Sequence, residues 1–346
     1  MREKKFIISI DTEGDNLWDW STGKPITTNN AKYLPRFQNL CEKYGFKPTY
    51  LTNYEMANDP FFIETFSKAR EENRCEIGMH LHAFFSPPDE YCLTERSDCA
   101  GKQAYLIEFP PEVMEAKISF MTDLIAKRFG IRPISHRAGR WAMNDVYFRL
   151  LDRYGFLVDC SVTPGVNWKS HIGFSSESGG SDYTKSRTKP YCVPGTELLE
   201  LPMTIVKDHR YYHPERFGLR SFVGSIRRAI MGDDILWMRP NGWNLENMLW
   251  IADYVSRSNA QYLMFMIHSS ELAPHCNPRF TSEEQIEKLY SDIQTVFSYV
   301  SNKYRGETVG DFAKSILRKK VLKNRKKRES HGKTMDGCDQ AEKESI

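Results

Sequence analysis

Two pairs of polar residues near the start of the chain have the types and spacing needed for metal-assisted hydrolysis. Asp11 and Glu13 lie in the segment IDTEGD, and His80 and His82 lie in EIGMHLHAF, each pair next to an apolar run. Residues two apart on a strand project to the same face. One carboxylate can then bind a metal ion while the other acts as general base, and both imidazoles can reach one ion at about 2.0–2.1 Å.

Each pair also has a purely structural interpretation. Acids at a strand end, such as Asp11 and Glu13, can cap a helix or face solvent, and His80 and His82 can be core residues bonded to the backbone. Two histidines with one carboxylate are nevertheless a common open zinc set that leaves a position for water. Because both pairs occur in one chain, we expect a metal site.

Two later segments offer groups that could support such a site. Arg137 and Arg140 flank an Ala-Gly step in SHRAGRW, and a guanidinium can keep a catalytic carboxylate ionised and oriented. His268 lies between an apolar run and a Ser-rich turn in MFMIHSSEL, which suits a general acid near neutral pH. The structural alternatives are a surface ion pair for each arginine and a backbone-bonded core position for the histidine.

These residues require a fold that brings strand ends together. Short β-branched and aromatic runs, bounded by Gly, Pro or charged residues, predict seven buried strands. The runs cover residues 6–11, 49–52, 76–82, 133–137, 157–162, 198–205 and 262–268. The candidate residues lie at or just after the ends of these runs.

Amphipathic stretches predict helices between the strands, the clearest at residues 111–129, 145–154, 245–258 and 281–304. Alternating strands and helices favour a mainly parallel sheet. Seven such units, with no dinucleotide-binding fingerprint after the first strand, favour a barrel over a Rossmann sheet. In barrels of this kind the active site lies at the C-terminal ends of the strands.

Charge separates the end of the chain from its body. The 346 residues carry a formal net charge of +3, but residues 318–346 contain ten Lys or Arg and five Asp or Glu, which leaves the rest at −2. We therefore expect no nucleic-acid partner for the body. Eight basic residues among positions 318–328 are a composition typical of disorder. We expect a catalytic barrel at residues 1–316 and a basic, disordered tail at 317–346.

Compartment is predicted from three features. The eight cysteines are scattered without a CxxC pair, which indicates reduced thiols. The apolar run before Asp11 is too short for a signal peptide, and no stretch approaches the roughly 20 apolar residues of a membrane span. We expect a cytoplasmic protein whose basic tail contacts the inner membrane face, since each basic residue near anionic lipid contributes about 1 kcal/mol.

The four motifs, in this order and at these spacings, resemble the polysaccharide deacetylase family, also called the NodB-homology domain, over roughly residues 6–313. The resemblance implies an α/β fold, a distorted (β/α)7 barrel. Two departures from the commonest family pattern are Thr12 between the two acids and the HxH spacing of the histidines. Both are similar to a divergent branch of the family.

The same resemblance implies roles for the residues near the metal. Glu13, His80 and His82 would hold a divalent metal, expected to be Zn²⁺, and Asp11 would be the catalytic base. The sequence leaves open whether Asp11 or Glu13 is the ligand. His268 would protonate the leaving amine.

Supporting roles follow from the resemblance as well. Arg137 or Arg140 would brace Asp11, and Asp159, in the segment VDCSV, would orient the site. Aromatic residues can stack against the apolar face of a sugar. The candidates for this contact are Trp18, Trp20, Trp141, Trp168, Trp243 and Tyr211, and of these we expect Trp141, Trp18 and Trp243 to bind the substrate.

The resulting expectation is a hydrolase of carbon–nitrogen bonds other than peptide bonds. Its substrate would be an N-acetylated sugar in a glycan or cell-envelope polysaccharide, or a precursor of one. Because a fold does not fix a substrate, a cyclic amide or ureide hydrolase on the same barrel is an alternative. A catalytically inactive carbohydrate-binding barrel is another.

Overall fold

The computed structural model describes residues 3–15, 17, 25–83, 86–88, 105–173, 179–208, 223 and 235–336, with side chains described as far as residue 322. All seven predicted strands form within these ranges. They are β1 Lys4–Thr12, β2 Thr49–Thr52, β3 Glu76–Leu81, β4 Ser135–Ala138, β5 Val158–Asp159, β7 Leu199–Glu200 and β10 Tyr262–His268.

These strands lie side by side in one nine-stranded sheet of order β10-β1-β2-β3-β4-β5-β7-β6, with β11 (Tyr304–Gly306) also paired to β1. All the pairings are parallel except that of β6 (Tyr191–Cys192), which runs antiparallel to β7. The register places Asp11 beside His268 and His80 beside Arg137. The C-terminal ends of β1, β3, β4 and β10 therefore meet at one edge.

The sheet curls, and isolated backbone hydrogen bonds join its two sides. Met266 of β10 donates to the carbonyl of Met238 (3.1 Å), and Met238 donates to that of Thr204 (3.2 Å). The last two residues flank a separate antiparallel pair, β8 (Ile205–Lys207) with β9 (Ile235–Trp237). A mainly parallel sheet with such a partial closure is a distorted (β/α) barrel, as the sequence predicts.

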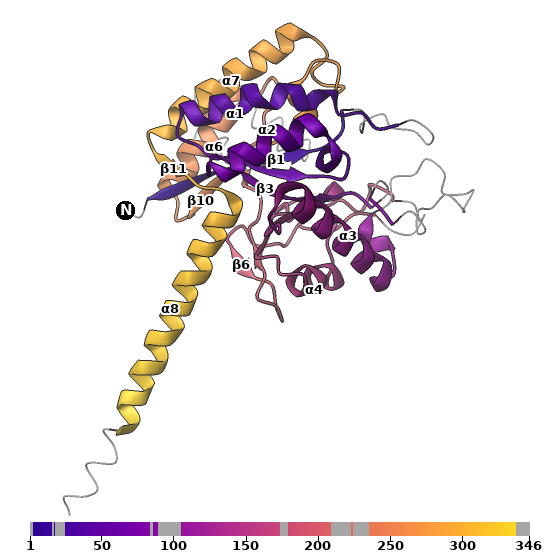
Figure 1. Cartoon of the computed structure of the whole chain (residues 1–346). Helices are drawn as coiled ribbons and strands as arrows, with labels where there is room; N and C mark the ends of the chain where they lie inside the picture. Colours follow the sequence, from indigo (N-terminus) through magenta and orange to yellow (C-terminus); the bar gives the residue numbers. More distant parts are fainter. Residues whose placement is uncertain are drawn as a thin grey trace, which may run out of the picture.

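Helices cover the outside of the curled sheet (Figure 1). The four clearest predicted helices all form within two to three residues of their expected ends. In chain order the α-helices are α1 Leu34–Lys43, α2 Pro60–Glu71, α3 Pro111–Phe129, α4 Asp145–Arg153, α6 Leu245–Arg257, α7 Glu283–Ser301 and α8 Val309–Asp336. The 3-10 helices are η1 Asn29–Tyr33, η2 Met56–Asn58, η5 Leu106–Glu108, η6 Gly139–Trp141 and η8 Ser269–Leu272.

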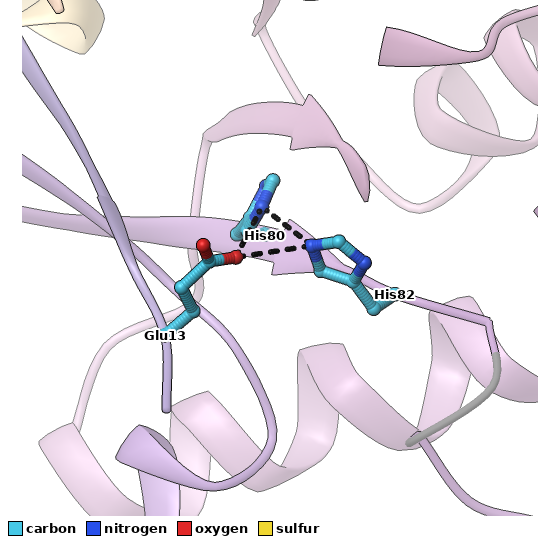
Figure 2. A group of neighbouring side chains, drawn as sticks. All are labelled: Glu13, His80 and His82. Carbon is cyan, nitrogen blue, oxygen red and sulfur yellow. Dashed lines mark hydrogen bonds and ion pairs between the residues drawn. The ribbon is translucent and has the colours of Figure 1, made fainter. Parts of the chain in front are cut away.

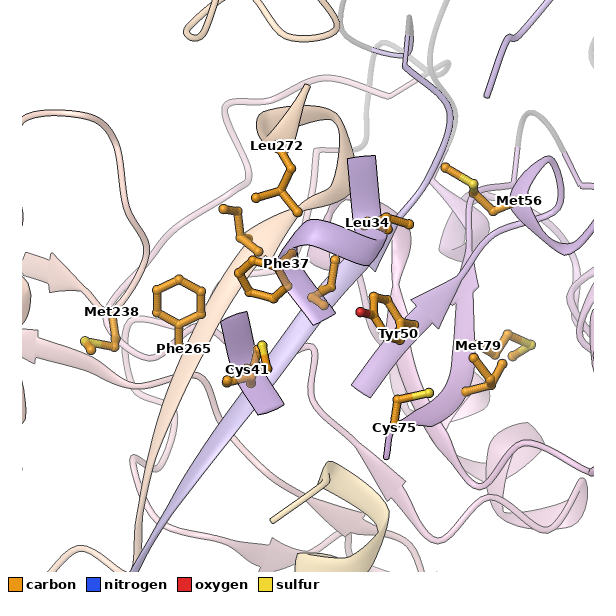
Figure 3. Packing of buried hydrophobic residues seen from close by; sticks show 14 of the residues in the cluster. Leu34, Phe37, Cys41, Tyr50, Met56, Cys75, Met79, Met238, Phe265 and Leu272 are labelled. Carbon is orange, nitrogen blue, oxygen red and sulfur yellow. The ribbon is translucent and has the colours of Figure 1, made fainter. Parts of the chain in front are cut away.

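The core between sheet and helices follows helical and strand periodicity (Figure 3). Leu34, Phe37 and Cys41 of α1 are fully buried, and their spacing places them on one helix face. The ring of Phe37 lies 6.1 Å from that of Phe297 on α7, which in turn lies 5.5 Å from that of Phe265 on β10. This packing fixes β1 and β10, the two strands that carry the acids and the late histidine.

Helix α8 spans the expected boundary between the barrel and the basic tail, and the disorder of that tail stays a prediction. The helix runs to Asp336, so residues 317–336 are helical, and Figure 1 shows its far part extending away from the barrel. Its first turns belong to the body, because Val309, Phe312 and Ala313 are buried. Lys, Arg and Leu are good helix formers, which explains how a basic segment can continue a packed helix. Residues 337–346 lie outside the described part of the chain.

Within the described part of the chain, no helix combines the length and the apolar character that crossing a membrane requires.

Candidate metal centre and active site

Three ligand atoms converge at the strand ends (Figure 2). Nε2 of His80 lies 3.0 Å from Nε2 of His82, and Oε2 of Glu13 lies 3.4 Å from the first and 3.1 Å from the second. Tetrahedral ligands at zinc-type bond lengths are separated by about 3.3 Å. The three side chains thus have the donor types and the spacing of a divalent metal site.

The surrounding backbone sets the orientation of both imidazoles. Nδ1 of His80 lies 2.9 Å from the carbonyl oxygen of Arg137, which can only accept a hydrogen bond. Nδ1 therefore carries the proton of the neutral ring, and Nε2 keeps its lone pair for an ion. A Cβ on Gly139 would lie 2.7 Å from Nδ1 of His82 and 2.7 Å from the carbonyl oxygen of Leu81. Glycine is therefore required at position 139 for the ring of His82 to take its place.

Burial and mutual charge shift the ionisation of these groups. Burial would raise the pKa of Glu13, but His268, His80 and His82 outweigh it and hold that pKa well below its usual range. Burial lowers the pKa of His82. It also opposes protonation of His80, but Asp11 and Glu13 together raise the pKa of that residue. A carboxylate ionised at neutral pH beside two imidazoles suits a metal ion.

Asp11 and Glu13 have different partners in the site. Oδ1 of Asp11 pairs with Nη1 of Arg137 at 2.6 Å, while Oδ2 lies 3.9 Å from Nε2 of His80. Burial would raise the pKa of Asp11, but Arg137 and then His80 and His268 hold it below its usual range. Arg137 is itself fully buried and also donates to Ser9 Oγ (2.8 Å) and to the carbonyl of Cys160 (3.1 Å). Asp11 is thus ionised and fixed in orientation.

Arg137, and not Arg140, braces Asp11. Arg140 turns away, because its backbone has φ 55° and ψ 23° in the left-handed region. Its guanidinium lies over the ring of Tyr105 at 3.9 Å and donates to the carbonyl of Ile172 (3.2 Å). Arg140 therefore forms part of the pocket wall.

His268 faces the two acids from β10, the strand next to β1. Its Nε2 lies 3.7 Å from Oδ2 of Asp11 and 3.8 Å from Oε1 of Glu13. Its Nδ1 lies 2.9 Å from Nη2 of Arg239 and 3.2 Å from Oε2 of Glu271. In the tautomer whose Nδ1 accepts from Arg239, the proton of the ring lies on Nε2, which points toward the acids.

Arg239 and Glu271 are two site residues that the sequence did not predict. They pair at 2.8 Å, and Glu271 is buried. Burial would raise the pKa of Glu271, but Arg239 and His268 hold it well below its usual range. The sequence places Glu271 only three residues after His268, which could have indicated a contact between them. Arg239 follows a strand of three residues, which is too short to be recognised from the sequence.

A cavity of about 320 Å³ encloses these groups. Aromatic and cationic side chains form the wall opposite the acids. The lining consists of Asp11, Glu13, Leu17, His80, His82, Tyr105, Arg140, Trp141, Trp168, His171, Arg239 and His268.

Asp159 lies behind this cavity and does not line it. It is fully buried, pairs with Nδ1 of His136 at 2.6 Å and accepts from Ser161 Oγ at 2.8 Å. Ser161 Oγ in turn accepts from the backbone N–H of Ala138 (2.8 Å). Asp159 can therefore orient the end of β4 through its neighbours, but it cannot touch a substrate in the cavity.

The three tryptophans expected to bind sugar have different positions. Trp141 lines the cavity, and its ring lies over the guanidinium of Arg137 at 4.9 Å. Trp243 is 85% exposed and does not line the cavity. It lies in a turn, where its backbone N–H donates to Asn241 Oδ1. Trp18 lies outside the described residues. Trp168, unlike Trp243, lines the cavity.

Comparison with known proteins gives matches among solved structures alone. No family model and no curated protein matches this chain. A proposed polysaccharide deacetylase from Mycobacterium smegmatis matches with a TM-score of 0.49 and 13% identity, over 92% of this chain and 93% of that one. A peptidoglycan deacetylase from Bacillus subtilis matches with a TM-score of 0.41 and 11% identity, over 94% and 98%.

A further match is the family 4 carbohydrate esterase domain of a multidomain xylanase from the hindgut metagenome of Trinervitermes trinervoides. Its TM-score is 0.42 and its identity 9%, over 91% of each chain. The first of these structures carries the name of the family that the four motifs resemble. At such identities and scores they assign no activity to this chain.

Proposed function

We propose that this protein is a metal-dependent hydrolase that removes the acetyl group from an N-acetylated sugar. The observation that carries the proposal is the convergence of three groups in one cavity. They are the Glu13, His80 and His82 cluster, the Asp11 carboxylate paired with Arg137, and the His268 imidazole paired with Glu271. Asp11 lies within 4 Å of both His80 and His268, and Glu13 lies within 4 Å of His80, so the residues proposed as ligands, base and acid are neighbours.

The three cluster residues fit a divalent ion by donor type and spacing. A bound ion would polarise the acetyl carbonyl and lower the pKa of a water from 15.7 toward about 7. The combination of two imidazoles and a carboxylate suits Zn²⁺ among the common ions. Because Glu13 is bonded to both histidines, we propose Glu13 and not Asp11 as the carboxylate ligand.

Asp11 would accept the proton of the attacking water. Its Oδ1 is occupied by Arg137, so Oδ2 is the oxygen that can act as base, and this oxygen faces His80 and His268. A base held ionised by a buried guanidinium works over a wide pH range but is weak. An ion held by Glu13, His80 and His82 would compensate for that weakness by making the water more acidic.

His268 would give a proton to the departing amine. Its Nε2 carries the proton when Nδ1 accepts from Arg239, and Glu271 and Arg239 hold the ring in place. The sugar itself would lie against Trp141 and Trp168, whose rings supply apolar faces on the cavity wall.

Acetate release tests the proposal directly. We expect the purified, zinc-loaded protein to release acetate from N-acetylated oligosaccharides, and Asp11→Asn to reduce kcat by at least about 100-fold with little change in KM, since a general base contributes about 10²–10⁴-fold. Zinc content equal to that of wild type would show that Asp11→Asn leaves the ligands intact. Unchanged kcat in that variant would refute the role of Asp11.

We also propose that the substrate is met at the cytoplasmic face of a membrane. Support comes from the eight basic residues at positions 318–328 and from helix α8, which carries them away from the barrel.

A further inference from the structure

A second cavity of about 470 Å³ adjoins the proposed active site. Two residues, Trp168 and Arg239, line both cavities, so the two spaces share a wall. The second one lies between β9 and the start of α6, and three asparagine amides line it. These amides come from Asn241, Asn244 and Asn247.

The second cavity carries a net positive charge. Arg239 and Arg279 line it, and both guanidinium groups pair with a single carboxylate oxygen, Oε1 of Glu271, at 2.8 and 3.8 Å. No acidic residue appears among its described lining residues. Two cations that share one anion leave about one unit of positive charge, which favours an acidic ligand group.

The turn that presents Arg239 is held in place. Asn244 accepts from the N–H of Asn241 (2.9 Å) and donates to the carbonyl of Arg239 (2.8 Å). Gly242, between them, has φ +86°, a backbone conformation that favours glycine. Arg239 is thus presented by a fixed turn, whereas Arg279 is 46% exposed at the outer end of the cavity.

An aromatic wall connects the two cavities. The ring of Trp237, in the second cavity, lies 6.0 Å from that of Trp141 in the first and 6.3 Å from that of Trp168, which lines both. The Nε1 of Trp168 donates to Thr163 Oγ1 (2.8 Å), which fixes its ring. A ligand that occupies both cavities would contact these rings.

We propose that the second cavity binds an acidic group, a phosphate or a carboxylate, carried next to the acetylated sugar. This inference rests on the proposed function, because it places the sugar in the first cavity. Arg239 and Arg279 would pair with the acid and the asparagine amides would bind neighbouring oxygens. The protein would then select acidic substrates over neutral N-acetylated oligosaccharides.

Steady-state kinetics of Arg279→Ala test the inference with three probes. They are neutral diacetylchitobiose, N-acetylglucosamine 1-phosphate, and a disaccharide of N-acetylglucosamine with glucuronic acid. We expect wild type to favour an acidic probe, and Arg279→Ala to raise KM for that probe about tenfold, equivalent to about 1.4 kcal/mol. The kinetics of diacetylchitobiose should not change, and Arg279→Lys should recover part of the loss. Whichever acidic probe responds identifies the acid as phosphate or carboxylate.

Arg36→Ala provides a matched control, because Arg36 is also 46% exposed and pairs with Glu287 away from both cavities. Equal losses on neutral and acidic probes, or no loss on either, would overturn the inference. If wild type releases acetate from no probe, the proposed function fails instead. Calorimetric titration of N-acetylglucosamine 1-phosphate into wild type and Arg279→Ala would then still decide the acid site, since binding that is equal or absent in both would refute it.

Discussion

At the scale of single residues, the site depends on buried charges that stabilise one another. Asp11, Glu13 and Arg137 are nearly inaccessible to solvent, and an ionised group of this kind is costly to bury unless it is paired. Arg137 pairs with Asp11, and the imidazoles of His80 and His82 contact Glu13. Each of these side chains is therefore needed both for the fold and for the proposed chemistry.

Arg137→Lys separates the two contributions. Lysine keeps the positive charge but cannot reach Asp11, Ser9 and the Cys160 carbonyl together, as the guanidinium does. Because the pKa of Asp11 should rise when this contact weakens, we expect the acidic limb of the kcat/KM profile to move to higher pH. We also expect kcat to fall at least about tenfold, because a misplaced base loses part of the roughly 10²–10⁴-fold that a positioned proton-transfer group contributes.

A pH profile of acetate release, with thermal unfolding as a check on folding, measures this effect. An acidic limb at the wild-type pH in a folded Arg137→Lys variant would contradict the bracing role of Arg137.

At the scale of elements, the ends of β3 and β4 form the proposed metal site through one close backbone approach. Gly139→Ala would place a Cβ 2.7 Å from both the ring of His82 and the carbonyl of Leu81. We expect this variant to bind zinc at least about tenfold more weakly, because support around ligands typically affects affinity by 10–100-fold. Competition with a chelating dye would measure that affinity.

Gly45→Ala is the matched control for Gly139→Ala. No atom lies within 4 Å of its added Cβ, and its φ of +71° makes alanine strained there. It should lose stability, by about 1 kcal/mol, and keep the zinc affinity of wild type. Equal zinc affinity in both variants would show that the contact with His82 is unimportant.

The strands behind the site carry a buried pair of acids. Burial and the neighbouring Asp159 raise the pKa of Glu200 well above its usual value, while His136 outweighs burial and lowers the pKa of Asp159. The folded protein thus keeps a proton on Glu200 that the unfolded chain loses near pH 4.5. Folding stability contributed by Glu200 must fall as pH rises above that value, by about 1.4 kcal/mol per pH unit until the folded pKa is reached.

Glu200→Gln removes this pH dependence, because the amide stays neutral and can still donate to Asp159. Urea unfolding at pH 5 and pH 8 should therefore show a smaller loss of stability at pH 8 in the variant than in wild type. Equal losses in the two proteins would mean that Glu200 has no raised pKa.

The sequence predicted the strands whose residues form a clear local pattern of apolar side chains. The apolar runs of β1, β3 and β10 placed Asp11, His80 and His268 at strand ends, and the parallel register then brings such ends together. The sequence did not predict the role of Arg239, because the preceding strand β9 is only three residues long. The partners of Arg239, His268 and Glu271, also lie 29 and 32 positions away along the chain. The sequence also could not choose between Arg137 and Arg140, since the choice depends on the left-handed backbone of Arg140.

At the scale of the whole molecule, α8 joins the barrel to a strongly basic segment. Val309, Phe312 and Ala313 pack in the core, whereas Val321 and Leu322 are 66% and 50% exposed. Basic residues surround these two apolar side chains in the sequence RKKVLKNRKKR. This composition suits the surface of an anionic membrane.

Vesicle sedimentation tests that contact. We expect the full chain to sediment with vesicles containing phosphatidylglycerol at low salt, to be released at 0.5 M salt because screening weakens the attraction, and not to sediment with phosphatidylcholine. A chain shortened after Leu317 should lose binding and keep its activity on soluble probes. Undiminished binding of the shortened chain would rule out α8 as the contact.

The central claim is that Glu13, His80 and His82 hold a catalytic ion. The most direct measurement is zinc content and acetate release of wild type, His80→Ala and His82→Ala, with His171→Ala as a control from the same cavity that lies outside the cluster. The account predicts one ion per chain in wild type and His171→Ala, and loss of both ion and activity in the other two. A wild type that binds no ion when supplied with excess zinc, or a His80→Ala variant with full activity, would contradict it.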